Sequence, residues 1–216
     1  MYQVGAFREE RIDVMQALMR DHRLATLVTV QDGVPQANHL PLLIDPDPAP
    51  NGTLRGHVAR ANSVWRQVQD GCEVLAIFQG PQAYVTPSWY PSKRETGQVV
   101  PTWNYAVVHA YGPLIVRDDR EWLRNLVTRL TDQQEAALPQ PWRVDDAPAD
   151  YLERMLGAIV GIEIPVSRLI GKWKVSQNRS DADRMGVAEG LAQFDDPQAQ
   201  AIADLVAERA ANKRPV

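Results

Sequence analysis

The sequence of 216 residues contains one cysteine, Cys72, and no apolar run of about 18 residues. A single cysteine permits neither an intrachain disulfide nor a paired-cysteine zinc or redox site. Without a long apolar run, no membrane-spanning helix is expected. The first thirty residues carry too many charges for a signal peptide, which favours a cytoplasmic location. Because 44% of the residues are hydrophobic, the chain can bury a substantial core.

The chain also lacks the basic excess typical of DNA-binding proteins. It has 27 acidic residues and 23 Lys or Arg, a net charge of −4, whereas a large DNA footprint needs a basic face. The charge is unevenly spread, because residues 48–117 contain three acids against six cations and residues 167–180 contain no acid. Strands are generally poor in acids, which explains much of this pattern. These windows nevertheless suit an anionic ligand.

Several catalytic and nucleotide-binding motifs are missing. No GxxxxGK[ST] or GxGxxG sequence is available to hold a phosphate, and no GxSxG sequence supplies a nucleophilic serine. The four histidines lack the paired spacing of a zinc site, so no metal is expected. No catalytic acid, base or nucleophile can be named from the sequence.

The hydrophobic pattern predicts an α+β protein with antiparallel strands. Two β-hairpins are predicted, in residues 24–45 around Asp32-Gly33 and in residues 73–89 around Gly80-Pro81-Gln82. Further strands are expected over residues 52–58, 103–116 and 157–175, and helices over residues 8–21, 62–69, 119–137, 179–192 and 196–211. Strands that come mostly as hairpins, without regular βαβ alternation, favour an antiparallel barrel with helices at its side.

The stretch VPTWNYAVVHAYG, residues 100–112, is unusual for a core strand. As a strand it places alanine and valine on one face and two tyrosines, a valine and a histidine on the other. Four other stretches also mix apolar or aromatic side chains with amides, hydroxyls and cations: HLPLLI, GHVARANSVW, AYVTPSWY and KWKVSQNR. Each residue taken alone is more often a packing or capping residue. The five stretches together favour a site for a planar, aromatic, anionic ligand.

Two of these stretches run into predicted helices, at residue 62 and at about residue 180. Free N–H groups at a helix N-terminus attract anions. Arg60, Lys174 or Arg179 would add positive charge there, so a phosphate could be bound without a glycine-rich loop.

In this order, the segments resemble the PaiB family, the FMN-binding negative transcriptional regulators. The resemblance extends over nearly the whole chain, and the combination of SWY, VPTWNY and K-x-SQNR is its most specific part. It implies an antiparallel split β-barrel with Greek-key connections, flanked by helices, as in pyridoxamine-phosphate-oxidase-like flavoproteins. It also implies a homodimer with FMN at the subunit interface.

The resemblance further implies a set of cofactor-binding residues. His57, Arg60 and Asn62 would face the phosphate or ribityl chain. Lys174, Gln177 and Asn178, from the same or the partner subunit, would close the site. The remaining residues would meet the ring or its edge or complete the cleft: His39, Thr86, Ser88, Trp89, Thr102, Trp103 and Asn104.

We expect a barrel domain over residues 1–175, with inserted helices at about 119–156, and C-terminal helices over 176–216 that belong to the same domain. Three functions are compatible with the sequence. The first is an FMN-binding dimer acting as a transcriptional regulator or flavin-linked sensor. The second is a flavin-dependent oxidoreductase for a small molecule, since fold does not fix function. The third is a direct DNA-binding repressor that carries no flavin. The acidic closing helices argue against this function, because they do not form a basic recognition helix.

Overall fold

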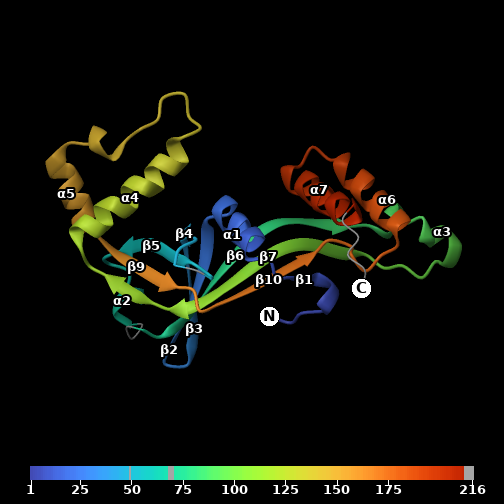
Figure 1. Ribbon diagram of the computed structural model, residues 1–216, viewed down its shortest axis with the longest axis horizontal. Helices are drawn as coiled ribbons and strands as arrows, with labels where there is room; N and C mark the ends of the chain where they lie inside the picture. Colours follow the sequence, from blue (N-terminus) through green and yellow to red (C-terminus); the bar gives the residue numbers. More distant parts are fainter. Residues whose placement is uncertain (49, 68–70, 212–216) are drawn as a thin grey trace. The chain divides into compact units, whose positions relative to one another are not determined.

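The computed structural model describes residues 1–48, 50–67 and 71–211 (Figure 1). The strands, in chain order, are β1 (Arg8–Glu9), β2 (Leu24–Gln31), β3 (Val34–Pro41), β4 (Leu43–Asp45), β5 (Thr53–Ala59), β6 (Glu73–Val85), β7 (Thr102–Pro113), β8 (Ile115–Arg117), β9 (Ile159–Pro165) and β10 (Arg168–Lys174). The helices are α1 (Ile12–Asp21), α2 (Val64–Gln67), α3 (Ser92–Thr96), α4 (Arg120–Glu135), α5 (Ala149–Gly157), α6 (Asp181–Ala192) and α7 (Pro197–Ala211), with short 3-10 turns η1 (Gly5–Phe7), η2 (Pro87–Trp89) and η3 (Val144–Asp146).

The described strands form two sheets. Within these sheets, the pairs β1–β10, β2–β3, β2–β6, β4–β5, β5–β9 and β8–β9 are all antiparallel. One sheet has the order β1-β10-β7-β6-β2-β3 and the other the order β4-β5-β9-β8. The predicted α+β class with antiparallel sheets and flanking helices is therefore confirmed. None of the described helices has the length and apolar character needed to cross a bilayer.

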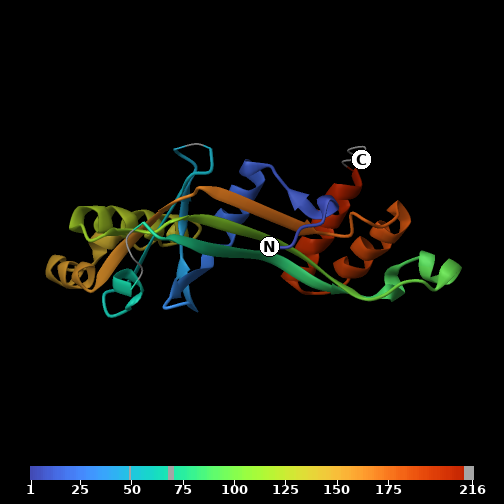
Figure 2. The same cartoon turned by 90° about the horizontal axis from the view of Figure 1, so that it is seen from below.

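The chain divides into two compact units. The first comprises Met1–Met15, Gln79–Val108 and the chain from Ile170 onward, and the second comprises Gln16–Phe78 and His109–Leu169. The points where the chain passes from one unit to the other fall within α1, β6, β7 and β10. Figure 2 shows the ribbon from a second side.

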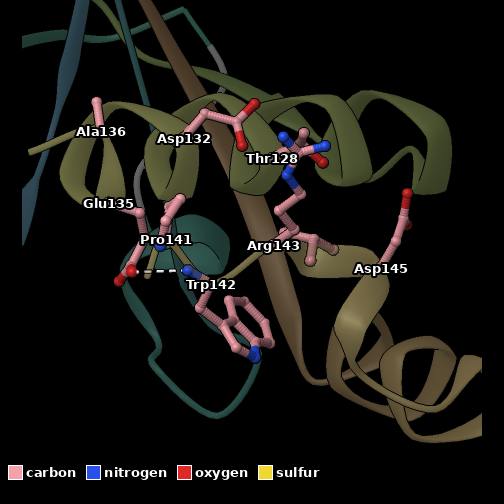
Figure 3. A pocket seen from close by; sticks show the side chains of 9 residues that line it. Thr128, Asp132, Glu135, Ala136, Pro141, Trp142, Arg143 and Asp145 are labelled. Carbon is pink, nitrogen blue, oxygen red and sulfur yellow. Dashed lines mark hydrogen bonds between the residues drawn. The ribbon is translucent and has the colours of Figure 1, made fainter. Parts of the chain in front are cut away.

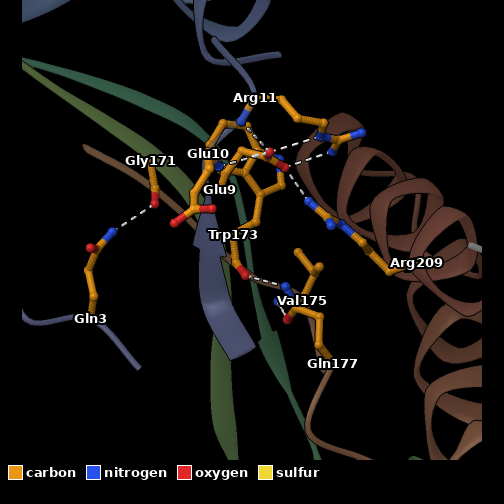
Figure 4. A network of polar contacts seen from close by, with 9 residues as sticks. All are labelled: Gln3, Glu9, Glu10, Arg11, Gly171, Trp173, Val175, Gln177 and Arg209. Atoms are coloured by element: carbon orange, nitrogen blue, oxygen red, sulfur yellow. Dashed lines mark hydrogen bonds and ion pairs between the residues drawn. The ribbon is translucent and has the colours of Figure 1, made fainter. Parts of the chain in front are cut away.

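In the first unit, α7 is tied to β1 by a buried carboxylate. Glu9, whose side chain is 3% exposed, accepts hydrogen bonds from Arg11 Nε at 2.9 Å and Nη2 at 2.7 Å, and it also pairs with Arg209 of α7 (Figure 4). Burial by itself would raise the pKa of Glu9. The hydrogen bonds from Arg11 and the charges of Arg209 and Arg11 outweigh burial and lower this pKa to about 2.

In the second unit, α4 and α5 build a small core with Val144 of η3. Leu123 of α4 packs with Leu152 and Leu156 of α5, all of them buried. Trp122 lies directly over Gly161 of β9, where a Cβ atom would come within 2.3 Å of the indole. A glycine at this position therefore lets helix α4 approach the sheet closely.

Most predicted elements occur where the sequence placed them. The hairpin β2–β3 turns at Asp32 and Gly33, both with positive φ, as expected for a two-residue hairpin turn. Asn62 Oδ1 accepts from Val64 N at 2.9 Å, and Asp196 Oδ1 accepts from Gln198 N at 3.0 Å, so these two side chains cap the starts of α2 and α7. Residues 68–69 of the predicted helix over 62–69 lie outside the described part.

The predicted second hairpin is wrong, because residues 73–85 form one strand, β6. Up to Gly80 the buried residues of β6 occupy the even-numbered positions, and from Pro81 onward they occupy the odd-numbered positions. A one-residue shift of this kind is what a β-bulge produces, and glycine and proline are common at bulges as well as in turns. In β7 the predicted alternation is present, since Ala106, Val108 and Ala110 are fully buried.

Candidate functional site

The thirteen predicted cofactor-binding residues fall into two groups. His39, His57, Arg60 and Asn62 belong to the second unit, and the other nine belong to the first. Each group is described within its own unit.

The most exposed large aromatic pair of the first unit lies on neighbouring strands β6 and β7. Trp103 is 48% exposed and Tyr84 is 50% exposed, with ring centroids 6.1 Å apart and ring planes at 63°. Trp103 Nε1 donates a hydrogen bond to Gln82 Oε1 at 3.0 Å, which fixes the indole. The pair therefore offers a fixed aromatic surface that a planar ring system could cover.

A lysine lies beside this aromatic pair. Lys174 Nζ donates to the carbonyl oxygen of Trp103 at 2.8 Å and to Thr102 Oγ1. Burial lowers the pKa of Lys174, and the positive charges of Lys172 and Arg179 lower it further. The structure thus brings three of the predicted residues together: Thr102, Trp103 and Lys174.

Two predicted residues, Asn104 and Gln177, instead hold the loop that follows β10. Asn104 is fully buried and donates from Nδ2 to Ser176 Oγ at 2.9 Å, while its Oδ1 has no partner among the described residues. Gln177 Oε1 accepts from Val175 N at 2.8 Å, and its Nε2 donates to the Trp173 carbonyl (Figure 4). Asn178 is exposed.

Residues Thr86, Ser88 and Trp89 form the turn η2 and its cap. Thr86 Oγ1 accepts from Ser88 N at 3.3 Å, and Ser88 is exposed. Trp89 packs on α6, since a Cβ on Gly190 would lie 2.5 Å from its ring atoms. A ring in this position supports the turn, and its role toward a flavin stays a prediction.

Helix α6 holds this segment by a second contact that the sequence did not indicate. Asp183, 3% exposed, accepts from Ser92 N at 3.1 Å and from Ser92 Oγ at 2.7 Å. A carboxylate in the first turn of a helix looks like an ordinary solvated cap. The spacing of Gly186 and Gly190, four residues apart on one helix face, was the available signal for a close contact.

In the second unit, Arg60 is engaged by its own chain. Its guanidinium pairs with Asp118, Nε donates to the Gly157 carbonyl at 2.8 Å, and Nη2 donates to the Ile159 carbonyl at 3.0 Å. These contacts use four of its five N–H groups. Arg60 therefore joins the end of β5 to the segment that leads into β9, and its predicted contact with the phosphate stays untested.

The other residues of this group differ in what they offer. Asn62 donates from Nδ2 to Asn38 Oδ1 at 2.8 Å besides capping α2. His39 is exposed on β3. His57 Nδ1 is buried without a hydrogen-bond partner among the described residues, and burial lowers the pKa of His57. A neutral imidazole at pH 7 would serve as a hydrogen-bonding group and not as a cation.

The starts of helices α2 and α6 offer fewer free N–H groups for an anion than the sequence led us to expect. The described part of helix α2 is Val64–Gln67, and Asn62 Oδ1 accepts from the N–H of Val64 at its start. The N-terminus of α6 is capped by Ser180, whose hydroxyl accepts from Asp183 N at 3.2 Å, and carries two acids in its first turn.

A cavity of about 410 Å³ lies elsewhere, between α4 and the segment that leads to η3 (Figure 3). Its lining includes Asp132, Glu135, Trp142 and Arg143, and Trp142 N donates to Glu135 Oε2 at 2.9 Å. None of the thirteen predicted residues lines it. The described residues also contain no cluster of three or more His, Cys, Asp or Glu side chains suited to a metal ion.

The residues of the first unit fit a flavin by their chemistry. An exposed indole and phenol can cover the isoalloxazine ring, and a half-buried lysine beside them can meet negative charge. When bound, FMN supplies the electron- and hydride-transfer chemistry, and the protein supplies binding and orientation.

Comparisons with known proteins agree with this chemistry. The family described as "Putative FMN-binding domain" matches residues 1–168. The chain is 34% identical over 209 residues to "Protease synthase and sporulation protein PAI 2" of Bacillus subtilis, covering 97% of this chain and 98% of that protein. It is 35% identical over 244 residues to an uncharacterized protein of Emericella nidulans, covering 97% of each.

Solved structures share the fold at low sequence identity. The FAD and heme binding protein of Mycobacterium smegmatis superposes with a TM-score of 0.59 and 18% identity, covering 77% of this chain and 73% of that one. The conserved hypothetical protein Rv2991 of Mycobacterium tuberculosis gives a TM-score of 0.57 and 13% identity, covering 83% and 94%. The chain thus belongs to the PaiB family of FMN-binding proteins with the split-barrel fold.

Proposed function

We propose that the protein is a cytoplasmic homodimer that binds FMN at the subunit interface and acts as a transcriptional regulator or flavin-linked sensor. We also propose one FMN-binding domain over residues 1–175, with inserted helices at about 119–156 and the C-terminal helices as part of the same domain. The name of the Bacillus subtilis relative, which refers to protease synthesis and sporulation, supports a regulatory role.

The observation that carries the flavin assignment is the exposed Tyr84–Trp103 pair with Lys174 beside it. Tyr84 and Trp103 are each about half exposed, and the amino group of Lys174 lies 2.8 Å from the carbonyl oxygen of Trp103. Exposed aromatic pairs are costly unless a ligand or partner covers them. FMN, a planar anion, would cover the rings and meet the cation.

The edge strand β3 supports the dimer. It lies at one end of the six-stranded sheet, and of its eight residues only Leu40 is buried. Val34 is 54% exposed, and Val30 on the paired strand is 65% exposed. An edge strand with apolar side chains invites pairing or packing with another chain. A second copy of this protein would cover it.

The dimer is tested by light scattering after size exclusion, together with the FMN content per subunit. We expect a dimer carrying about one FMN per subunit. Val34→Glu should produce monomers and release FMN, because it places a charge in the interface. Leu138→Glu, at another exposed apolar residue (51% exposed) outside β3, is the matched control and should change neither property. A wild-type monomer that retains FMN would contradict an interface site.

The same preparation distinguishes the alternative functions. Oxidation of NAD(P)H above the free-FMN background would favour a flavin-dependent oxidoreductase. Binding to DNA that weakens as salt rises would favour a direct repressor. A flavin whose redox state changes without turnover of a substrate would favour a sensor.

A further inference from the structure

The cavity of about 410 Å³ in the second unit lies between two walls (Figure 3). The first wall is one face of α4, because its lining residues stand at positions i, i+4, i+7 and i+8 of the helix: Thr128, Asp132, Glu135 and Ala136. The second wall is the segment of residues 141–145, which leads into η3. The volume falls within the range of about 300–1,000 Å³ that is typical of small-molecule sites.

Several contacts hold the second wall in place. Val144 is buried in the small core that α4 and α5 form. The backbone N–H of Trp142 donates to Glu135 Oε2 at 2.9 Å, and Arg124 of α4 pairs with Asp145 at 2.5 Å. A cavity whose walls are fixed before a ligand arrives loses less conformational entropy on binding.

The lining also carries charges of both signs that are not paired with each other. Asp132 and Glu135 contribute two carboxylates from α4, and Arg143 contributes a guanidinium from the second wall. None of the salt bridges within residues 1–48, 50–67 and 71–211 includes any of these three side chains. Opposite charges that line one cavity without pairing are both available to a ligand.

Trp142 adds an apolar surface to the same cavity. Its side chain lines the cavity and is 47% exposed. Burial of an exposed indole by an apolar group is favourable, because it removes apolar surface from water. The lining thus suits a small molecule that combines a cation, an anion and an apolar group.

We infer that this cavity binds a free amino acid. The ammonium group of the ligand meets the carboxylates of Asp132 and Glu135, and its carboxylate forms paired hydrogen bonds with the guanidinium of Arg143. The side chain of the ligand covers the indole of Trp142. A simple cation would leave Arg143 unpaired, and a simple anion would be repelled by the two acids. The inference goes beyond the proposed function and does not rest on it, because none of the thirteen predicted cofactor-binding residues lines the cavity.

The test is isothermal calorimetry on the full-length protein. The standard amino acids are titrated first, and we expect at least one of them to bind. The amino acid that binds most tightly is then compared with two analogues that keep its side chain: the amine without the carboxyl group and the acid without the amino group. Each analogue should bind about tenfold or more weakly than the amino acid, since it loses one set of charge-assisted hydrogen bonds.

Two variants separate the contributions of the two charges. Asp132→Asn should weaken the amino acid and the amine about tenfold and leave the acid analogue no weaker. Arg143→Gln should weaken the amino acid and the acid analogue and leave the amine no weaker. The matched controls are Asp21→Asn and Arg20→Gln, at exposed residues of α1 in the same unit that do not line the cavity, and both should bind all three compounds as the wild type does. Thermal melts establish that each variant is folded.

Failure of every amino acid to bind the wild type would overturn the inference. An analogue that binds as tightly as the amino acid would also overturn it, because one of the two charges would then contribute nothing. Equal weakening of all three compounds by both variants would have the same consequence, since the variants would then act by distorting the cavity. A wild type that binds an amino acid but no FMN would refute the proposed function alone.

Discussion

The contact of Trp89 with helix α6 makes Gly190→Ala an informative perturbation. A Cβ at this position would lie 2.5 Å from two ring atoms of Trp89 and 2.6 Å from a third. An indole is rigid, so either the helix or the turn η2 must shift. Overpacking of this kind costs about 1–3 kcal/mol, whereas replacing glycine by alanine inside a helix gains about 1 kcal/mol. We expect a net loss of about 1–2 kcal/mol, because three rigid atoms are contacted.

The matched control is Gly157→Ala, near the end of α5. The three atoms nearest to its added methyl group would belong to the guanidinium of Arg120, the nearest at 2.9 Å, and a flexible side chain can move away. This variant should be neutral or gain up to about 1 kcal/mol. The two variants should thus differ by about 1–3 kcal/mol, measured as thermal or denaturant stability.

Gly190→Ala should also weaken FMN, because Thr86 and Ser88 belong to the segment that Trp89 anchors. Trp89→Leu combined with Gly190→Ala should be less destabilised than the sum of the two single changes, since the smaller side chain relieves the clash. The reasoning would be refuted if Gly190→Ala were as stable as Gly157→Ala and the double variant were additive.

Two further predictions concern the ion pairs. Glu9→Gln should remove a pH-dependent part of the stability: the pKa of Glu9 is lowered from 4.5 to about 2, so its contribution of about 3 kcal/mol is present above pH 4.5 and is lost as the pH falls toward 2. Urea unfolding between pH 2.5 and 7 measures this, and an unchanged slope in Glu9→Gln would count against it. Arg60→Ala should lower the melting temperature more than Asp118→Asn does, because Arg60 also donates hydrogen bonds to the carbonyl oxygens of Gly157 and Ile159. Equal decreases in melting temperature would show that only the ion pair with Asp118 stabilises the protein.

Local signals in the sequence predicted the elements well. Asp32-Gly33 allows the positive φ angles of a tight hairpin, so this turn followed from a short stretch alone. The Gly80-Pro81 pair led to the wrong prediction of a second hairpin, because glycine and proline are common both in turns and at β-bulges. Only the pairing of β6 with its neighbours decides between them.

For the candidate site, the sequence indicated residue types but not the contacts that those residues make. Aromatic, amide and cationic residues in five stretches indicated a planar anion, and Trp103, Thr102 and Lys174 do lie together. The sequence could not show that Arg60 would be paired with Asp118, 58 positions away. Nor could it show that Asn104 of β7 and Gln177 would both hold the loop that follows β10, because such contacts depend on tertiary packing.

The most direct test of the flavin assignment is an FMN titration of the purified wild type, Trp103→Ala and Trp142→Ala, followed by absorption and by flavin fluorescence. Trp142 is a matched control, since it is equally exposed (47%) and lines the cavity near η3, which none of the predicted residues lines. We expect about one FMN per subunit in the wild type and in Trp142→Ala, with affinity about fivefold or more weaker in Trp103→Ala, since stacking on an indole is worth about 1–3 kcal/mol. Equal binding by all three proteins, or no binding by the wild type, would contradict the account.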